Sequence, residues 1–282
     1  MQTNIHPDLI ALPKVQEADA ILRKCVHCGF CTATCPTYQL LGDELDGPRG
    51  RIYLIKNLLE DSTISDDSIA HLDRCLTCRA CETTCPSGVE YGRLLDIGRE
   101  FVKDHANRPL RSRLLTFVLR LVVPRPVLFA PLLKLGQFCR PILPAFIKRH
   151  VPIKMPILHQ VEPVTGANVV LLSGCVQSAA TPNVVASLLK VLHHQGMDAE
   201  VFHEDCCGAL DYHLSEHEAG MQRMKVVIDQ LYPRIDQIDY IVSSATGCGV
   251  TIRDYPEILQ YDAVYRDKAS AIVDKLVDPI EI

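Results

Sequence analysis

The chain contains one cysteine run in two copies, first as Cys25-Val26-His27-Cys28-Gly29-Phe30-Cys31-Thr32-Ala33-Thr34-Cys35-Pro36 and again as Cys75-Leu76-Thr77-Cys78-Arg79-Ala80-Cys81-Glu82-Thr83-Thr84-Cys85-Pro86. Both copies have the C-x2-C-x2-C-x3-C-P spacing of bacterial [4Fe–4S] ligation, in which the fourth cysteine binds the neighbouring cluster. We therefore expect two [4Fe–4S] clusters with crossed ligation. One cluster would be held by Cys25, Cys28, Cys31 and Cys85, and the other by Cys75, Cys78, Cys81 and Cys35.

Zinc sites and disulfides are the two alternative interpretations of these cysteines. Zinc fingers usually separate their two cysteine pairs by about a dozen residues or more, whereas here the third and fourth cysteines follow at once. Residues Met1–Leu22 lack the basic and apolar regions of a secretory signal, and crowded thiols without such a signal favour a reducing compartment over disulfides. We therefore expect a cytoplasmic protein.

Composition sets the class of protein. The chain has 282 residues, of which 48% are apolar, and this supports two modest domains with packed cores. Its net charge of −5 argues against a nucleic-acid partner. No uncharged apolar run approaches the roughly 20 residues of a membrane-spanning helix. Of the 13 cysteines, eight lie in the two runs, four lie later, and Cys139 stands alone as an expected small buried apolar residue.

Residues 1–104 are predicted to form an α-helical domain around the two cysteine loops. A short helix over Glu17–Lys24 leads into the first run, and Asp46-Gly47-Pro48 marks a turn at a helix start. Two helical apolar sets then join the runs. They are Ile52, Ile55, Leu58 and Leu59, followed by Ile64, Ile69 and Leu72.

Three charged or titratable residues near the runs invite a functional interpretation. We expect Arg49 and Arg51 to be solvated surface charges. The alternative is that they lie near a cluster and raise its potential, because a positive charge favours the reduced state. His27 lies inside a ligand loop, but four cysteines per cluster are available, so we expect it not to be a ligand.

Residues 105–160 are predicted to be a basic, proline-rich connector. Ten Lys or Arg and no Asp or Glu occur from His105 to Lys154, and eight prolines occur from Pro109 to Pro156. Short apolar stretches between the prolines predict broken amphipathic helices. Such a segment can lie on an anionic membrane surface, dock on an acidic partner subunit, or pack on its own domains.

Residues 161–282 are predicted to form an α/β domain with a parallel sheet. Strands are expected at Val169–Leu172, Ala199–Phe202 and Tyr240–Val242, alternating with helices that include one near Glu216–Leu231. A last amphipathic helix is expected over Ala263–Val277. Four cysteines follow the carboxyl ends of the strands, where open α/β sheets place their sites, and we expect them to hold a third metal centre. These are Cys175, Cys206, Cys207 and Cys248. An iron–sulfur centre is favoured there, and zinc remains open.

The cysteine runs and two further stretches resemble a known family. The segment from Cys25 to Tyr38, the segment from Gly42 to Tyr53 and the second run are similar to the iron–sulfur subunits of bacterial glycolate oxidase. Gly174-Cys175, Cys206-Cys207-Gly208-Ala209 and Gly247-Cys248-Gly249 resemble the first cysteine-rich CCG repeat of that family, which heterodisulfide reductase subunits share. The helical N-terminal arrangement also looks like that of the iron–sulfur subunit of succinate dehydrogenase. The family usually carries two CCG repeats, whereas this sequence contains one, so we expect a truncated form or a missing half on another polypeptide.

The resemblance implies an electron-transfer subunit of an enzyme, glycolate dehydrogenase. Its partners would be flavin-containing 2-hydroxyacid dehydrogenase subunits, and its acceptor a membrane quinone reached by peripheral contact at the inner face of the cytoplasmic membrane. No G-x-G-x-x-G motif or P-loop occurs, so no dinucleotide site is expected on this chain. Two alternatives stay open: a catalytic subunit of the heterodisulfide reductase type, and the electron-transfer subunit of a lactate or glycerol-3-phosphate dehydrogenase.

Overall fold

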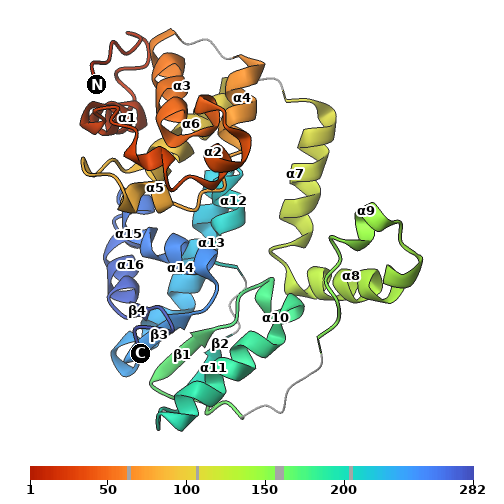
Figure 1. Ribbon diagram of the computed structural model, residues 1–282. Helices are drawn as coiled ribbons and strands as arrows, with labels where there is room; N and C mark the ends of the chain where they lie inside the picture. The colour runs from red at the N-terminus through yellow and green to blue at the C-terminus, as the bar shows by residue number, and fades with distance from the viewer. Residues whose placement is uncertain (62–64, 106–107, 156–161, 203–205) are drawn as a thin grey trace. The chain divides into compact units, whose positions relative to one another are not determined.

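The computed structural model describes residues 1–61, 65–105, 108–155, 162–202 and 206–282. The chain divides into two compact units, Met1–Pro109 and Leu110–Ile282 (Figure 1). The first unit is helical and the second contains a parallel sheet, which confirms the expected α + α/β class. The expected division into three parts, with a separate connector over residues 105–160, stays a prediction.

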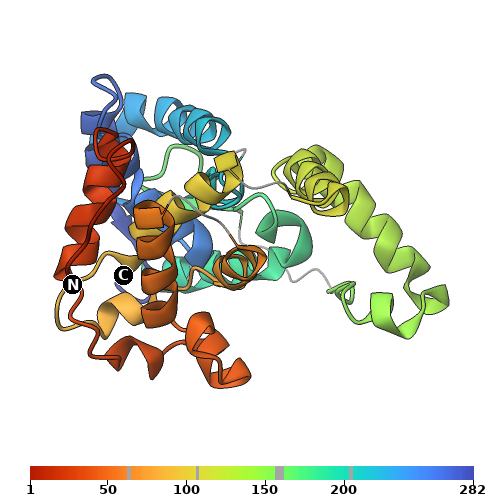
Figure 2. The same ribbon diagram turned by 90° about the horizontal axis from the view of Figure 1, so that it is seen from above.

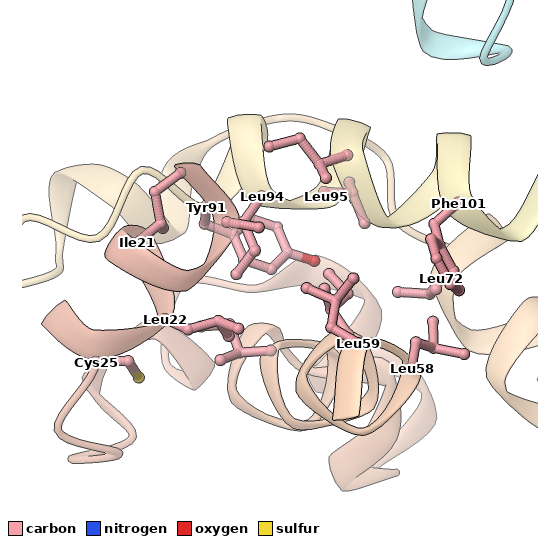
Figure 3. Close-up of a cluster of buried hydrophobic side chains, with 14 of the residues drawn as sticks. Ile21, Leu22, Cys25, Leu58, Leu59, Leu72, Tyr91, Leu94, Leu95 and Phe101 are labelled. Carbon is pink, nitrogen blue, oxygen red and sulfur yellow. The ribbon is translucent and has the colours of Figure 1, made fainter. Parts of the chain in front are cut away.

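Helices around the two cysteine runs build the first unit. Its elements are α1 (Pro13–Lys24), η1 (Phe30–Thr32), α2 (Pro36–Leu41), η2 (Glu44–Asp46), α3 (Pro48–Asp61), α4 (Asp66–Asp73), α5 (Ala80–Thr83) and α6 (Tyr91–His105). Helix α6 packs against α1 and α3, and the core between them includes Leu22, Leu59 and Leu94 (Figure 3). The apolar faces predicted for α3 and α4 are confirmed, except that Ile64 lies outside the described residues.

Prolines and one glycine fix where these helices begin. Helix α1 begins at Pro13, four residues before the predicted start, because proline presets the helical φ at a first turn. Pro36 likewise begins α2 directly after Cys35. At Gly50 a Cβ atom would lie 2.1 Å from the carbonyl oxygen of Glu44. Only glycine therefore allows α3 to start flush against η2, and this close approach positions the arginines of α3 near the cysteine loops.

The second unit combines a helical arm with an α/β domain. The arm contains α7 (Leu110–Val122), α8 (Pro126–Cys139), η3 (Arg140–Ile142) and α9 (Ala145–Lys148). The α/β domain contains β1 (Val169–Leu172), α10 (Gln177–Ala180), α11 (Pro182–His194), β2 (Ala199–Phe202), α12 (Ala209–His213), α13 (His217–Leu231), η4 (Tyr232–Gln237), β3 (Tyr240–Ser243), α14 (Thr246–Arg253), α15 (Tyr255–Ile258), α16 (Arg266–Val273) and β4 (Leu276–Val277).

The sheet is parallel, with strand order β2-β1-β3-β4. Alternate residues of β1 enter two cores because strand side chains point to opposite faces. Val169 and Leu171 pack with α11, whereas Val170 and Leu172 pack in the core that contains α13 and α16. The three predicted strands are confirmed. The last predicted helix is wrong at its end: α16 stops at Val273, and Leu276–Val277 instead pairs with β3 as β4, because this apolar pair completes the sheet edge.

Only some of the prolines in the arm mark the boundaries of helices. Pro126 begins α8, as a helix-starting proline should, but Pro131 lies inside α8 without ending it. Cys139 is partly exposed, which corrects the expectation that it is buried, since it lies at the end of α8 where packing is incomplete. Figures 1 and 2 show α8 and α9 running away from the sheet of their unit. Arg120 of α7 donates to the buried Asp211 of α12 at 2.7 Å.

Among the described residues, no single helix has the length and hydropathy needed to cross a bilayer. Two consecutive segments of the arm, Leu110–Val122 and Pro126–Ile142, satisfy that requirement only when counted together, and they are bent by 107°.

Candidate metal centres

The two cysteine loops follow nearly the same backbone path. His27 and Thr77, at equivalent positions, have φ of 56° and 55°, and the next turn residues, Gly29 and Arg79, also lie in the left-handed region. Non-glycine residues adopt that region at a cost and persist where the surroundings require it. Repetition of this rare conformation indicates that both loops are shaped to surround the same kind of bound group.

Threonine hydroxyls join the two loops. Thr34 donates to the carbonyl oxygen of Ala80 at 3.1 Å, and Thr84, the equivalent residue of the second run, donates to Thr34 Oγ1 at 3.2 Å. The loops are thus held face to face through matching positions of the repeat. This contact brings the end of each run toward the beginning of the other.

The structure distributes the eight thiols over two neighbouring cavities. The first cavity is lined by Cys25, Cys28, Cys31 and Cys85, and Cys81 also borders it. The second cavity is lined by Cys35, Cys75, Cys78 and Cys81. Each cavity therefore gathers three cysteines of one run and the last cysteine of the other. Pro48, Cys81 and Tyr91 line both cavities and form the wall between them.

Burial differs among these thiols and affects their protonation. Cys25, Cys35 and Cys81 are buried, whereas Cys28 and Cys78 are exposed. Burial raises the pKa of the Cys81 thiol, with Glu82 adding to the effect, and burial also raises the pKa of Cys31. A buried thiol with a raised pKa is a poor nucleophile, but metal coordination deprotonates it. The donor set therefore suits metal binding better than thiol catalysis.

The spacing of the thiols suits a cluster better than a single ion. Tetrahedral zinc with Zn–S bonds of about 2.3 Å places its sulfurs about 3.8 Å apart. In the described part of the chain, the one set of three or more ligand atoms that lie within 4.8 Å of one another is Asp43, Asp46 and His71, which contains no cysteine. Asp46 there is already engaged by arginine side chains, so this set is not a cation site. Soft thiolates around two wider cavities match iron–sulfur ligation.

Arg51 lies beside the second cavity, which corrects the expectation of a solvated surface charge. Its side chain is 1% exposed and lines the cavity with Cys35 and Cys75. Asp46, also 1% exposed, accepts from Arg51 Nη2 at 3.3 Å and from Arg74 Nη1 at 3.0 Å. Arg51 is buried because its carboxylate partner, Asp46, comes from the preceding turn η2, and the helical spacing of α3 does not indicate this contact.

Arg49 and His27 lie beside the first cavity. Arg49 is about half-exposed, donates to Glu44 Oε1 at 2.6 Å and lines this cavity. His27 lines it too, and its Nε2 atom is buried without a hydrogen-bond partner among the described residues. Burial lowers the pKa of His27, with the chain amino group and Arg49 adding to the effect. That His27 is not a ligand stays a prediction.

Two further residues near the second cavity contact ligand sulfurs and belong to no sequence motif. Tyr91 donates from its hydroxyl to Cys75 Sγ at 3.5 Å. The Thr37 hydroxyl lies 3.2 Å from Cys35 Sγ. Thr37 directly follows the Cys35-Pro36 pair, and this adjacency was the available signal. Tyr91 lies well past the second run, and no local pattern marks it.

The C-terminal cysteines also come together. Cys175 follows β1, Cys206 and Cys207 precede α12, and Cys248 lies in the first turn of α14. Cys175 Sγ and Cys206 Sγ lie 3.8 Å apart, and the Cys207 thiol hydrogen bonds with those of Cys206 and Cys248. Parallel strands bring their carboxyl ends to one sheet edge, which is why these four distant positions meet.

Protonation is unequal within this group. Hydrogen bonds from Cys175 and Cys207 lower the pKa of Cys206 to about 3, against the effect of burial. The same hydrogen bonds, together with burial, raise the pKa of Cys175 and Cys207. One thiolate held by neighbouring thiols is a preformed beginning of a thiolate ligand set. The neighbouring Arg223 further favours the charged Cys206.

Two family models match the chain in the regions that carry these thiols. A 4Fe-4S dicluster domain matches residues 21–89, and a cysteine-rich domain matches residues 169–253. The first match confirms the expected pair of [4Fe–4S] clusters in the first unit. No solved structure matches the chain.

Three curated relatives show the same kinship. The glycolate oxidase iron-sulfur subunit of Escherichia coli strain K12 is 47% identical over 291 residues, covering 100% of this chain and 70% of its own length. The probable glycolate oxidase iron-sulfur subunit of Bacillus subtilis strain 168 is 30% identical, covering 91% of this chain and 64% of its own length. The lactate utilization protein A of an Exiguobacterium strain is 30% identical over 123 residues, covering 41% of this chain and 49% of its own length.

Proposed function

The chain belongs to the family of glycolate oxidase iron–sulfur subunits, and on that premise we propose that it conducts electrons from a flavin subunit that oxidises glycolate to glyoxylate. Glycolate gives up two electrons and two protons to the flavin, and the electrons leave it singly. Bound [4Fe–4S] clusters supply one-electron transfer, while the protein sets their position and potential. The observation that carries this proposal is the pair of thiol-lined cavities separated by one shared wall.

The proposed ligand sets follow the walls of the cavities. Cys25, Cys28, Cys31 and Cys85 would hold the first centre, and Cys75, Cys78, Cys81 and Cys35 the second. A third metal centre is proposed at Cys175, Cys206, Cys207 and Cys248, either iron–sulfur or zinc, since the 3.8 Å between Cys175 Sγ and Cys206 Sγ also fits a zinc site with four thiolates. Iron and sulfide quantification on anaerobically purified protein distinguishes two centres from three.

The proposed function is tested by asking whether substrate reduces the clusters of this chain through the flavin subunit. The chain is purified anaerobically with its flavin subunit and mixed with glycolate, D-lactate or L-lactate. We expect glycolate to produce the electron paramagnetic resonance (EPR) signals of reduced clusters, and omission of the flavin subunit to abolish them. A glycolate-reduced flavin beside clusters that stay oxidised would contradict the proposal. Stronger reduction by a lactate would reassign the substrate and keep the electron-transfer role.

The arm formed by α7, α8, η3 and α9 is proposed as the contact with the membrane that contains the quinone. Its large apolar side chains are unusually exposed, with Val127, Phe138 and Ile142 each 83% exposed. Basic residues accompany them and no acidic residue occurs from His105 to Lys154. Exposed apolar surface marks an interaction site, and each basic residue near an anionic bilayer contributes about 1 kcal/mol. The bend between α7 and α8 suits helices that lie in the interface.

Vesicle binding tests this contact. The holoprotein is expected to sediment with phosphatidylcholine vesicles that contain phosphatidylglycerol, and to be released as salt rises. Phe138→Glu combined with Ile142→Glu should weaken this binding by about a hundredfold or more, because each buried side chain contributes about 1.5–3 kcal/mol. Ile280→Glu, at a 91% exposed apolar residue outside the arm, is the matched control. Absence of binding to anionic vesicles would contradict the membrane contact and leave an acidic subunit as the partner.

A further inference from the structure

Tyr91 lies in the wall between the two cavities. It is the first residue of α6, its side chain is 4% exposed, and it lines both cavities. Figure 3 shows its ring among the core side chains of this unit. The hydroxyl donates to Cys75 Sγ at 3.5 Å, which directs it to the second cavity only.

A buried guanidinium orients this hydroxyl. Arg51 lines the second cavity together with Tyr91. Its nitrogens donate to the His71 carbonyl oxygen at 2.7 Å, to Thr37 Oγ1 at 3.1 Å and to Asp46 Oδ1 at 3.3 Å, and these bonds hold the guanidinium in place. Because its positive charge attracts the phenol oxygen, the tyrosine turns its proton toward the sulfur. A nearby cation also polarises the hydroxyl and strengthens the hydrogen bond that it gives.

The two cavities differ in the hydroxyl group and the arginine that lie beside them. Tyr91 stands six residues after Cys85, and the equivalent position after Cys35 is Leu41, which has no hydroxyl and is 55% exposed. Arg49, the arginine that lines the first cavity, is partly exposed and paired with Glu44, whereas Arg51 at the second cavity is fully buried. The two cysteine loops therefore share a backbone path but differ in the residues that pack around them.

We propose that Tyr91, with the charge of Arg51 beside it, raises the reduction potential of the centre at Cys75, Cys78, Cys81 and Cys35 above that of its neighbour. Reduction adds one electron and makes a thiolate-ligated centre more negative. A hydrogen bond to a ligand sulfur and a nearby cation both stabilise that added charge, and both are levers that set cluster potentials. Tyr91 is thus a positioning residue that makes the second site the preferred resting place of the electron. The proposal rests on the ligand sets proposed above.

Potentiometric titration of Tyr91→Phe tests it. The holoprotein is titrated anaerobically and followed by EPR, with iron content measured on the same sample. We expect one midpoint potential to fall and the other to stay, at unchanged iron content. Arg49→Gln, at the first cavity, should shift the midpoint that Tyr91→Phe leaves alone, and this assigns the two signals. Tyr53→Phe is the matched control, since Tyr53 is half-exposed on α3 and lines neither cavity.

Two results would overturn the role of Tyr91. The first is an iron-replete Tyr91→Phe variant with both midpoints unchanged, and the second is an equal fall of both. If the variant loses a centre, incorporation of 3-fluorotyrosine at position 91 keeps the shape and strengthens the donor, so the second midpoint should rise instead. Wild-type protein without iron in this unit would contradict the proposed ligand sets themselves, which is a distinct outcome.

Discussion

Replacement of Cys35 by alanine is expected to remove the centre held by Cys75, Cys78 and Cys81 and to spare the centre held by the first run. The reason is geometric, because Cys35 lines the second cavity and not the first. Iron should fall by one cluster equivalent, about four iron atoms, and one of the EPR signals of the reduced protein should disappear. Cys139→Ala, outside all three thiol groups, should change neither measurement.

Two double variants separate crossed from uncrossed ligation. If ligation is crossed, Cys35→Ala with Cys78→Ala damages one centre twice and leaves the other intact. Cys35→Ala with Cys28→Ala then damages both centres. Uncrossed ligation reverses these two results, because Cys35 and Cys28 would serve the same centre. Iron content alone therefore decides, and the reversed pattern would refute the assignment of the last cysteine of each run.

Replacement of Asp46 by alanine is expected to destabilise the first unit by roughly 3–5 kcal/mol, since it leaves the buried Arg51 guanidinium without its carboxylate. Asp46 is 1% exposed and accepts hydrogen bonds from Arg51, Arg74 and His71. For a unit of this size the unfolding midpoint should fall by about 10 °C or more. The measurement is thermal unfolding of the holoprotein under anaerobic conditions at one fixed scan rate.

The matched control for Asp46 is an ion pair on the surface of the same unit. Lys24 Nζ lies 2.5 Å from Glu90 Oε2, and both side chains are about half-exposed. Glu90→Ala should therefore cost no more than about 1 kcal/mol. Equal losses for Asp46→Ala and Glu90→Ala would show that the buried network contributes nothing special to stability.

The dependence of stability on pH provides a second test of the role of Asp46. Burial alone would raise the pKa of this carboxyl, but hydrogen bonds from His71 and Arg74 outweigh it and hold the pKa below its usual value. The stabilisation from a carboxyl with a depressed pKa is present above its unfolded-state value, about 3.9, and is lost as pH falls through the lower folded-state value. Wild-type protein should lose this contribution below about pH 4, whereas Asp46→Ala should show a correspondingly weaker acid dependence.

Local patterns were sufficient for much of the fold. The apolar spacing predicted α3 and α4, and short apolar runs before cysteines predicted the strands β1, β2 and β3. The pattern failed at Leu276–Val277, where pairing with β3 outweighed a helical periodicity that the sequence supports equally well. Whether a short apolar segment forms a strand or a helix depends on whether a sheet edge is available to pair with it. The spacing of residues along the chain does not show this.

The candidate sites likewise contain some features that the sequence pattern predicts and others that it does not. Cysteine spacing is itself a geometric constraint, because ligands two residues apart can reach one cluster wherever the loop lies. The four C-terminal thiols were expected together for a similar reason, since parallel strands share an edge. The buried Arg51 and the hydroxyl of Tyr91 carry no such local constraint, and their roles depend on partners from η2 and α6.

Residue types and their spacing along the chain were enough to predict the cysteine ligands, to group them into repeated runs and to identify the family, because these features depend on residue type and on distance along the chain. Which polar groups surround each set of thiols depends on how the helices pack. Burial of Arg51 against Asp46 and placement of Tyr91 between the cavities require helices distant in sequence to pack together. The two cysteine runs are therefore nearly equal as sequence and unequal as environments, because the electrostatics of a site are set by all the groups that pack around it.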